Sequence, residues 1–318
     1  MNQHQPAGNI DRTALLRLAR AVRDTGYHSV AITPATHALV NSRPQNRWAC
    51  NLRDVFGWSR PFRADGLSTD LWALIQQAGV VEQHAEGWRS LVRLSSLDGE
   101  LFLHSAFPTL ARDAVFFGPD TYKFVDAVKA YLDVRTEPVE RAVDICCGAG
   151  PGALTIAKAR PKAEVLMADI NETALHFAGC NAELAGLANA KPRRSDLLSD
   201  VDGAFDLVVA HPPYLVDQGA RAYRHGGGAL GADLSLAIVR SATERLAPGG
   251  TLLLFTGIAI IDGGDPFLSE ITELLTDRGL RWSYREVDPD VFGDELARPP
   301  YDVADRIALV VLTATRDS

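Results

Sequence analysis

The residues best suited to chemistry lie in the middle of the chain, at the ends of short apolar runs. The first such feature is the segment 144–152, Asp-Ile-Cys-Cys-Gly-Ala-Gly-Pro-Gly, which follows an apolar run and precedes a helical pattern. Glycines at such a turn let the backbone approach a ligand closely, and Pro151 suits the first turn of a helix. The amides at the start of that helix can hold an anionic or polar group of a nucleotide-like ligand. Nicotinamide and flavin enzymes use a similar turn, and the same glycines could simply let a strand turn tightly into a helix.

Two carboxylates follow at the ends of the next two predicted strands. Asp169 ends the run Val165–Ala168, and an acid about 20 residues after such glycines suits the two hydroxyls of a ribose. The same residue could instead cap the helix that is predicted from Glu172. Asp196 comes after the third predicted strand, where a carboxylate could accept a hydrogen bond from an adenine amino group. The glycine-rich turn, Asp169 and Asp196, each at the end of a successive strand, indicate a nucleotide-like ligand more specifically together than any one of them does alone.

The fourth feature is the sequence His211-Pro212-Pro213-Tyr214, which directly follows the apolar run Leu207–Ala210. Two prolines stiffen this turn, because proline fixes its own φ and pushes the preceding residue into extended geometry. A stiff turn aims the His211 side chain and nearby carbonyls across the carboxyl edge of a sheet, where ligands bind. Tyr214 offers a flat face against which a planar group could stack. The simpler alternative is a loop whose prolines only end a strand.

The elements that must position these residues alternate between strand and helix from Arg141 onward, which indicates an α/β fold with a parallel sheet covered on both faces. Predicted strands span 142–146, 164–168, 190–194, 205–210 and 251–255, and predicted helices span 153–159, 172–184, 234–246 and 268–275. Two further runs, 281–287 and 306–313, should close the sheet as antiparallel strands. The proline-rich segment between them, 288–301, is long enough to fold over a site.

The first third of the chain has a different pattern. Apolar residues at helical spacing predict helices over 15–22 and 68–79, with a polar stretch at 33–53 between them. Strand-like runs on both sides of Asp98-Gly99 predict a hairpin. Helices followed by a small hairpin favour a smaller α+β domain, of the winged-helix kind, that serves substrate recognition or dimerisation. We therefore expect two domains, residues 1–110 and 111–318.

Charge is distributed unevenly between these two regions. The whole chain has a formal net charge of −8, yet residues 1–118 contain 12 arginines, no lysine and 10 acidic residues. The overall acidity argues against a general polyanion binder but leaves room for a local basic face. The four cysteines lack the spacing of a zinc site or disulfide framework, so no metal is expected. The longest apolar run is too short to span a membrane and the start of the chain has no signal core, which together predict a cytoplasmic protein with no membrane partner.

The order of these motifs resembles that of the class I S-adenosylmethionine-dependent methyltransferases. It is most similar to the HemK/PrmC type, which are relatives of the Asn-Pro-Pro-Tyr nitrogen methyltransferases. The similarity covers residues 115–285. It begins at Phe116–Thr121, and after the motif it continues through the glycine-rich segment 223–234 and through Pro248–Leu254. The resemblance implies a Rossmann-like sheet, S-adenosyl-L-methionine as the cofactor, and methyl transfer to a planar nitrogen.

The resemblance also implies a role for each matched position. The glycine-rich loop would run beside the methionine and ribose of the cofactor, and Asp144 would brace that loop or meet the amino-acid end of the cofactor. Asp169 would hold the ribose hydroxyls, its neighbour Ile170 would also contact the cofactor, and Asp196 with Leu197 would flank the adenine. The loop residues to which this cofactor role falls are Cys146, Cys147, Gly148, Ala149 and Gly150, and His211 would lie beside the cofactor as well.

In the family, the side-chain oxygen of the first motif residue and a proline carbonyl accept hydrogen bonds from the planar substrate nitrogen. The resemblance gives this catalytic role to His211 and Pro212, with Tyr214 beside them. The chain departs from the family here, because histidine replaces asparagine and can accept through a ring nitrogen only when it is neutral. His211 could instead serve as a general base. Cys146 also stands where the family usually has glycine.

Three functions remain open from the sequence. The first is methylation of a protein glutamine or of a nucleobase amino group, for which a positively charged N-terminal domain would suit a nucleic-acid or ribonucleoprotein partner. The second is methylation of a small molecule, or another reaction that consumes S-adenosylmethionine, with His211 as the base. The third is a cofactor-sensing nucleic-acid-binding protein. The methyl acceptor is thus a protein, a nucleic acid or a small molecule, and a homodimer is also considered.

Overall fold

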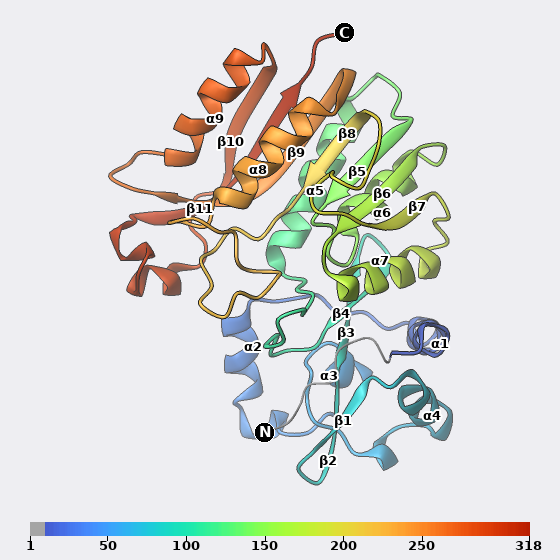
Figure 1. Cartoon of the computed structure of the whole chain (residues 1–318). Helices are drawn as coiled ribbons and strands as arrows, with labels where there is room; N and C mark the ends of the chain where they lie inside the picture. The colour runs from blue at the N-terminus through green and yellow to red at the C-terminus, as the bar shows by residue number, and fades with distance from the viewer. Residues whose placement is uncertain (1–9) are drawn as a thin grey trace.

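The computed structural model describes residues 10–318, and within them a seven-stranded mixed sheet forms the larger part of the molecule (Figure 1). The strand order is β10-β11-β9-β8-β5-β6-β7. Neighbouring strands from β9 to β7 run parallel, whereas β10 and β11 are antiparallel additions at one edge. The strands are β5 (Arg141–Ile145), β6 (Glu164–Asp169), β7 (Ala190–Arg194), β8 (Phe205–Ala210), β9 (Leu246–Ile260), β10 (Arg281–Asp288) and β11 (Arg306–Thr315).

Helices cover both faces of this sheet, which confirms the predicted α/β class. One face packs against α5 (Pro119–Val134), α6 (Pro151–Ala159) and α7 (Glu172–Leu184), and the other against α8 (Asp233–Glu244) and α9 (Pro266–Asp277). Side chains of β5 alternate between the two layers, because successive residues of a strand point to opposite faces. Ala142 belongs to the first hydrophobic cluster, and Val143 and Ile145 belong to the second.

The parallel register brings the predicted site residues to one edge. Ile145 at the end of β5 is paired with Ala168 of β6 on one side and with Ala210 of β8 on the other. The segments that follow these three residues carry the glycine-rich loop, Asp169 and His211. Ligands of open α/β sheets bind at this carboxyl edge, where strand order switches direction, and β5 lies at such a switch.

The N-terminal residues form a smaller helical and hairpin assembly below the sheet in Figure 1. Its helices are α1 (Arg12–Asp24), α2 (Pro34–Asn41), α3 (Leu52–Phe56) and α4 (Thr69–Ala78), and its strands are β1 (Val81–His84), β2 (Gly87–Ser90), β3 (Val92–Leu97) and β4 (Glu100–Ser105). β3 and β4 pair around Asp98-Gly99, as the sequence predicted. The winged-helix comparison and the domain boundary near residue 110 stay predictions.

Several expected bounds were wrong for local reasons. The polar stretch at 33–53 contains α2 and the start of α3. The side chain of each N-cap, Thr33 and Asn51, accepts a hydrogen bond from the amide three residues later. The strand expected over 251–255 is the longer β9, which begins at Leu246 and runs through Pro248-Gly249. The strand-like run before Asp98-Gly99 belongs to two strands, because β2 pairs with β1 before β3 begins.

The N-terminal part is tied to the sheet by a buried amide. Asn181 of α7 is fully buried, and its side chain accepts a hydrogen bond from Leu103 N (2.8 Å) and donates to Leu103 O (3.0 Å). The same amide donates to Ala149 O at 2.9 Å, within the glycine-rich loop. One side chain therefore links β4 to the predicted cofactor loop. Among the described residues, no helix is both long and apolar enough to cross a membrane.

Candidate active site

A cavity of about 880 Å³ opens at the carboxyl edge of the sheet, and the structure brings almost all of the predicted site residues to its walls. The exception is Gly150, where a Cβ would point at the Met167 sulfur and the Leu154 side chain, in the core and not in the cavity. The predicted residues that line the cavity are Asp144, Cys146, Cys147, Gly148, Ala149, Asp169, Ile170, Asp196, Leu197, His211, Pro212 and Tyr214. A cavity of this size is within the usual range for small ligands.

The glycine-rich loop reverses direction through three left-handed residues, Cys146 (φ 58°), Gly148 (φ 54°) and Gly150 (φ 85°). The left-handed region favours glycine because it has no Cβ, which explains why glycine is usual in the family where this chain has Cys146. The thiols of Cys146 and Cys147 are not nucleophiles at neutral pH, since burial and nearby carboxylates raise both pKa values well above the ordinary value. The two cysteines therefore contribute to the shape of the cavity wall and not to nucleophilic chemistry.

Asp169 holds the loop from the end of β6. Its Oδ2 accepts a hydrogen bond from Gly148 N (3.0 Å), and its Oδ1 accepts one from Asn171 N (2.9 Å). Burial raises the pKa of Asp169, although these amides act in the opposite direction. The helix cap that was the alternative role for Asp169 is supplied by Asn171, whose side chain accepts from Thr173 N. Asp169 is therefore free of the capping role.

Asp144 is buried beneath the same loop. Its Oδ2 accepts a hydrogen bond from Ala153 N (2.9 Å) in the first turn of α6, so it braces the start of that helix. Its Oδ1 is buried and has no hydrogen-bond partner among the described residues. Burial, together with the charge of Asp169, raises the pKa of Asp144 to about 7, although the hydrogen bond from Ala153 N acts in the opposite direction. A Cβ at Gly152 would lie 2.8 Å from Oδ2 of Asp144, so only glycine fits there.

Ile170, Asp196 and Leu197 line the part of the cavity formed by the ends of β6 and β7. Ile170 follows Asp169 and is 57% exposed, which is unusual for a large apolar side chain that has no partner to cover it. Asp196 is exposed after β7, and its amide donates to Asp200 Oδ2. Leu197 lies beside it in the left-handed conformation (φ 52°). An apolar side chain and a carboxylate therefore project from neighbouring strand ends, as a planar ring with an amino group would need.

His211 lies in an aromatic cage next to a buried carboxylate that the sequence did not predict. Its ring packs against Phe124 of α5 and Phe255 of β9, with centroid distances of 5.3 and 5.0 Å. Its Nε2 is 3.6 Å from Oδ2 of Asp120, which is longer than a hydrogen bond but within ion-pair range. The same oxygen accepts a 2.9 Å hydrogen bond from the Tyr214 hydroxyl. Asp120 thus connects the first and last residues of the His-Pro-Pro-Tyr turn.

The charge of Asp120 is stabilised by its surroundings. Burial raises the pKa of Asp120, but the contacts with His211, Tyr214 and the Thr121 amide outweigh it and hold the pKa below its ordinary value. The residue also lies in the first turn of α5, where the helix dipole favours an anion. Burial and the same carboxylate raise the pKa of Tyr214, so its hydroxyl stays protonated and donates. Asp120 is therefore an acceptor for His211.

Tyr214 is a buried structural residue as well as a cavity wall. Its ring lies over Gly257 of β9, where an added Cβ would come within 2.3 Å of the ring carbons. It stacks on His211 with ring planes 16° apart and meets Phe292 edge-on. The sequence predicted a flat surface for a substrate, but the ring is 6% exposed and packs mainly on the protein. Its position holds His211 in place.

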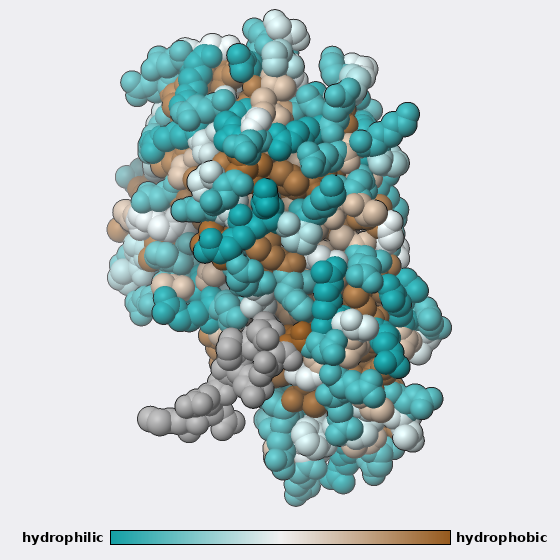
Figure 2. Space-filling model, turned by 45° about the vertical axis from the view of Figure 1, so that its right-hand side comes forward, coloured by the Kyte–Doolittle hydropathy of each residue, from teal (hydrophilic) through white to brown (hydrophobic). Residues whose placement is uncertain are grey.

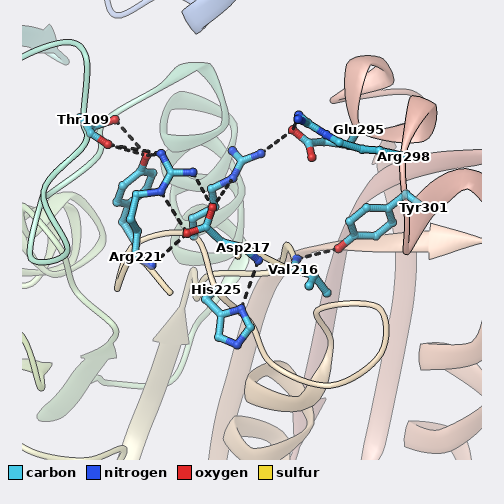
Figure 3. Close-up of polar contacts among 10 residues, drawn as sticks. Thr109, Val216, Asp217, Arg221, His225, Glu295, Arg298 and Tyr301 are labelled. Atoms are coloured by element: carbon cyan, nitrogen blue, oxygen red, sulfur yellow. Dashed lines mark hydrogen bonds and ion pairs between the residues drawn. The ribbon is translucent and has the colours of Figure 1, made fainter. Parts of the chain in front are cut away.

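The loop after the motif is held over the cavity by a network of charged side chains (Figure 3). Asp217 is buried and accepts hydrogen bonds from Arg221 Nε (3.0 Å) and Nη2 (2.5 Å), which lower its pKa to about 2. Arg224 lies 3.6 Å from the same carboxylate and binds Glu295 of the proline-rich segment at 2.5 Å. This network joins residues 216–225 to the segment that follows β10.

Further contacts hold the residues that lie over the cavity, 216–225 and 293–301, which we call the roof. Tyr301 donates to Leu230 O and accepts from Val216 N, at 3.1 and 3.0 Å. The Tyr223 hydroxyl lies 3.0 Å from Thr109 O, and its ring stacks on Phe116. The predicted cover, residues 288–301, therefore contributes to the cavity wall, together with residues 107–117. Sequence reasoning missed Asp120, Phe124 and Phe255, although Asp120 lies in the segment that resembles the family.

Comparison with known proteins agrees with this geometry. A family model described as the methyltransferase small domain matches residues 127–258. The release factor glutamine methyltransferase of Deinococcus radiodurans is 32% identical, with 54% of this chain and 67% of that protein covered. The chain belongs to the class I S-adenosylmethionine-dependent methyltransferases of the HemK/PrmC type.

Two other members of this family add information on the range of substrates. The ribosomal protein uL3 glutamine methyltransferase of Neisseria meningitidis strain Z2491 is 34% identical, with 42% of this chain and 47% of that protein covered. The 4-amino-L-phenylalanine/4-methylamino-L-phenylalanine methyltransferase of Streptomyces pristinaespiralis is 31% identical, with 46% and 51% covered. The chain thus spans about half the length of these two relatives.

The residues present fit the cofactor that the family name implies. The unpartnered Oδ1 of Asp144 offers a buried acceptor for an ammonium group. Gly148 leaves open space where a side chain would otherwise fill the cavity, since its nearest neighbour in the Cβ direction is 4.0 Å away. Carboxylates at the ends of β6 and β7 complete a set of hydrogen-bond acceptors suited to hydroxyl and amino groups. The arrangement agrees with a nucleoside that carries an amino acid.

Proposed function

We propose that the protein transfers a methyl group from S-adenosylmethionine to a planar nitrogen, and that the acceptor is a glutamine amide of a protein. The observation that carries this proposal is the His211-Pro212-Pro213-Tyr214 turn, held by Asp120 at the mouth of the cavity. Two of the relatives named above are glutamine methyltransferases of translation proteins. When bound, the cofactor would supply an electrophilic methyl group on a sulfonium.

The cofactor would be held by the residues of the glycine-rich loop and the two following strand ends. Asp169, which already fixes Gly148, would bind the ribose hydroxyls, and Asp144 would meet the ammonium group with its free Oδ1. Ile170 and Leu197 would enclose the adenine, and Asp196 would accept from its amino group. These side chains hold and orient the cofactor but take no part in bond making.

His211 would accept a hydrogen bond from the substrate nitrogen. Asp120 is ionised and can only accept, so its position beside Nε2 favours the tautomer that carries a proton on Nε2. Nδ1 then keeps its lone pair. This atom is bonded to Cγ, as the side-chain oxygen of asparagine is, so it can occupy the place of the family's acceptor. His211 would thereby provide the hydrogen-bond acceptor that asparagine provides in the family.

The chain's own groups would activate the substrate by orientation. If Nδ1 of His211 and the carbonyl of Pro212 each accept one amide hydrogen, the planar nitrogen is fixed with its lone pair directed out of conjugation. Fixed acceptors in a site with little water need no rearrangement during the reaction, and orientation alone can contribute several kcal/mol, on the order of 7–11 in the best cases. No general base would be needed before methyl transfer, because the lone pair of the neutral nitrogen would make the new bond. The nitrogen would then lose one of its two protons to Nδ1 of His211 or to solvent.

A small-molecule amine is the second candidate acceptor. It is favoured by one specific observation, the roof of residues 216–225 and 293–301 that is tied down by Asp217, Arg224 and Glu295. A closed roof suits a small substrate better than an extended peptide. The relative from Streptomyces pristinaespiralis is named for an aromatic amine, which is also a planar nitrogen. His211 would then have the same acceptor role.

The test is an identification of the methylated product. The protein is incubated with methyl-labelled cofactor and either cell protein, RNA, DNA or a panel of amines, and the product is located by mass spectrometry. We expect label on a glutamine side chain of a protein, absent with the His211→Ala variant. Label on an amine alone would establish the second candidate, and label in none of these fractions would contradict both.

A further inference from the structure

A second recess lies in the N-terminal part, at the end of α2 that is far from the active site. It has a volume of about 340 Å³ and is bordered by the segment after α2 and by β2. Four of its lining residues are arginines and none is acidic; the arginines are Arg43, Arg47, Arg60 and Arg89. We call it the arginine recess. These four are among the 12 arginines that give residues 1–118 their excess of positive charge.

Three of these four cations lack an anionic partner. Arg60 is neutralised by Asp54 at 2.6 Å, and both side chains are 9% exposed, so this pair is structural. Within residues 10–318, no carboxylate forms an ion pair with the other three arginines, and residues 1–9 contain no acidic residue. Arg89 Nε is buried without a hydrogen-bond partner among the described residues, and its Nη2 reaches only His84, at 3.4 Å. Buried donors and converging like charges both favour a bound anion.

The recess is directly connected to the active site by α2. Thr33, Pro34 and Ala35 at the start of this helix line the catalytic cavity, whereas Asn41 and Arg43 at its end line the recess. Eight residues of helix rise about 12 Å, so an anion in the recess would lie about that distance from the cavity mouth. Figure 1 shows α2 leading away from the loops at the carboxyl edge of the sheet.

We propose that the arginine recess binds a phosphate of an RNA backbone. A carboxylate is satisfied by one guanidinium fork, whereas a phosphate can receive hydrogen bonds from two or three at once. Figure 2 shows one face of the molecule that is largely hydrophilic, with hydrophobic residues in scattered patches; its colours report hydropathy and not the sign of the charge. The choice of RNA rests on the proposed function, because a glutamine acceptor in a ribosomal protein, for which the relative from Neisseria meningitidis is named, would place RNA beside the target side chain.

The test measures RNA binding without any turnover. Fluorescence anisotropy of a labelled single-stranded RNA oligonucleotide is followed with the full chain, without cofactor, over a range of salt concentrations. For Arg43→Gln combined with Arg47→Gln we expect an affinity about tenfold lower at low salt, and a slope of log affinity against log salt that is smaller by about 0.7, the value for one phosphate of a single strand. The double substitution by lysine should restore the salt slope but not the full affinity.

Two controls keep the result interpretable. Arg17→Gln removes an exposed arginine of α1 outside the recess and should leave binding unchanged. Thermal melting shows whether each variant folds. Equal loss in the Arg17 variant, or no RNA binding by the unaltered chain at low salt, would overturn the proposal. Tight competition by polyglutamate or by inorganic phosphate alone would also overturn it. Failure of methyl transfer with intact RNA binding would refute the proposed function instead.

Discussion

Asp120 Oδ2 stands between the Nε2 of His211, at 3.6 Å, and the hydroxyl of Tyr214, at 2.9 Å. Asp120 comes from the start of α5, 91 positions before His211 and outside the sheet. In the proposed function, this contact would let a histidine serve where the family has an asparagine, because a fixed carboxylate would select the tautomer. The long distance to His211 is compatible with tightening when substrate binds.

Asp120→Asn should lower turnover about tenfold or more, because an amide neither attracts the Nε2 proton as strongly nor holds a single tautomer. Affinity for S-adenosylmethionine should stay within about threefold, as Asp120 is placed at the substrate end of the cavity. The control is Asp126→Asn on the exposed side of the same helix. Steady-state kinetics and calorimetry separate the two effects. An unchanged rate in the Asp120 variant would refute the positioning role.

His211→Asn restores the residue usual in the family and tests the acceptor role directly. We expect this variant to retain activity within about tenfold, and His211→Ala to lose on the order of 100-fold, since only asparagine offers an acceptor at that place. Product formation with labelled cofactor is the measurement. If both variants are equally inactive, His211 acts as a base and the tautomer argument fails.

Asp169→Ala should weaken the binding of S-adenosylmethionine by about 10- to 100-fold, the usual loss for hydrogen bonds to a charged group. The substitution also frees the Gly148 amide, so thermal melting is measured alongside. Glu172→Ala is the matched control, because it removes an exposed acid three residues away that pairs only with Arg194. Calorimetry that shows equal loss in both variants would contradict the ribose role.

Asp144 predicts a pH dependence of stability with a definite sign. Its pKa in the folded protein is raised to about 7, so the folded state holds this proton more tightly than the unfolded chain does. Stability from this group therefore falls as the pH rises from about 4 to about 7, and is constant above. We therefore measure the melting temperature of Asp144→Asn minus that of the unaltered protein, and we expect this difference to increase from about pH 5 to about pH 8. A constant difference would show that the carboxyl titrates normally.

Gly257→Ala tests the support beneath the catalytic turn. The added methyl group would meet the Tyr214 ring, and overpacking of this kind costs about 1–3 kcal/mol of stability. Because Tyr214 is linked to Asp120, turnover should fall more than cofactor affinity. Tyr214→Phe removes only the hydroxyl and reports how much of that loss comes from the hydrogen bond. Full activity in the Gly257 variant would mean that Tyr214 can move without consequence.

The part of the candidate site that the resemblance assigns to the cofactor could be located from the sequence, because its residues are local to strand ends. Parallel strands in register bring their carboxyl ends together, so each motif has a fixed place as soon as the strand is recognised. The glycine-rich loop, Asp169 and Asp196 all follow this rule, and the structure places them around one cavity. Gly150 was the exception, since its conformation serves core packing against Met167.

The amino-acid sequence by itself determined the α/β class, the family resemblance and the order of the cofactor motifs. Only the tertiary structure decided what surrounds His211, because Asp120, Phe124 and Phe255 come from elements far apart in the chain. The same holds for the roof, whose arginines and acids look like ordinary surface charges until the fold pairs them. Strand and helix periodicity is local, whereas contacts between side chains on different elements depend on packing, and no short segment encodes them.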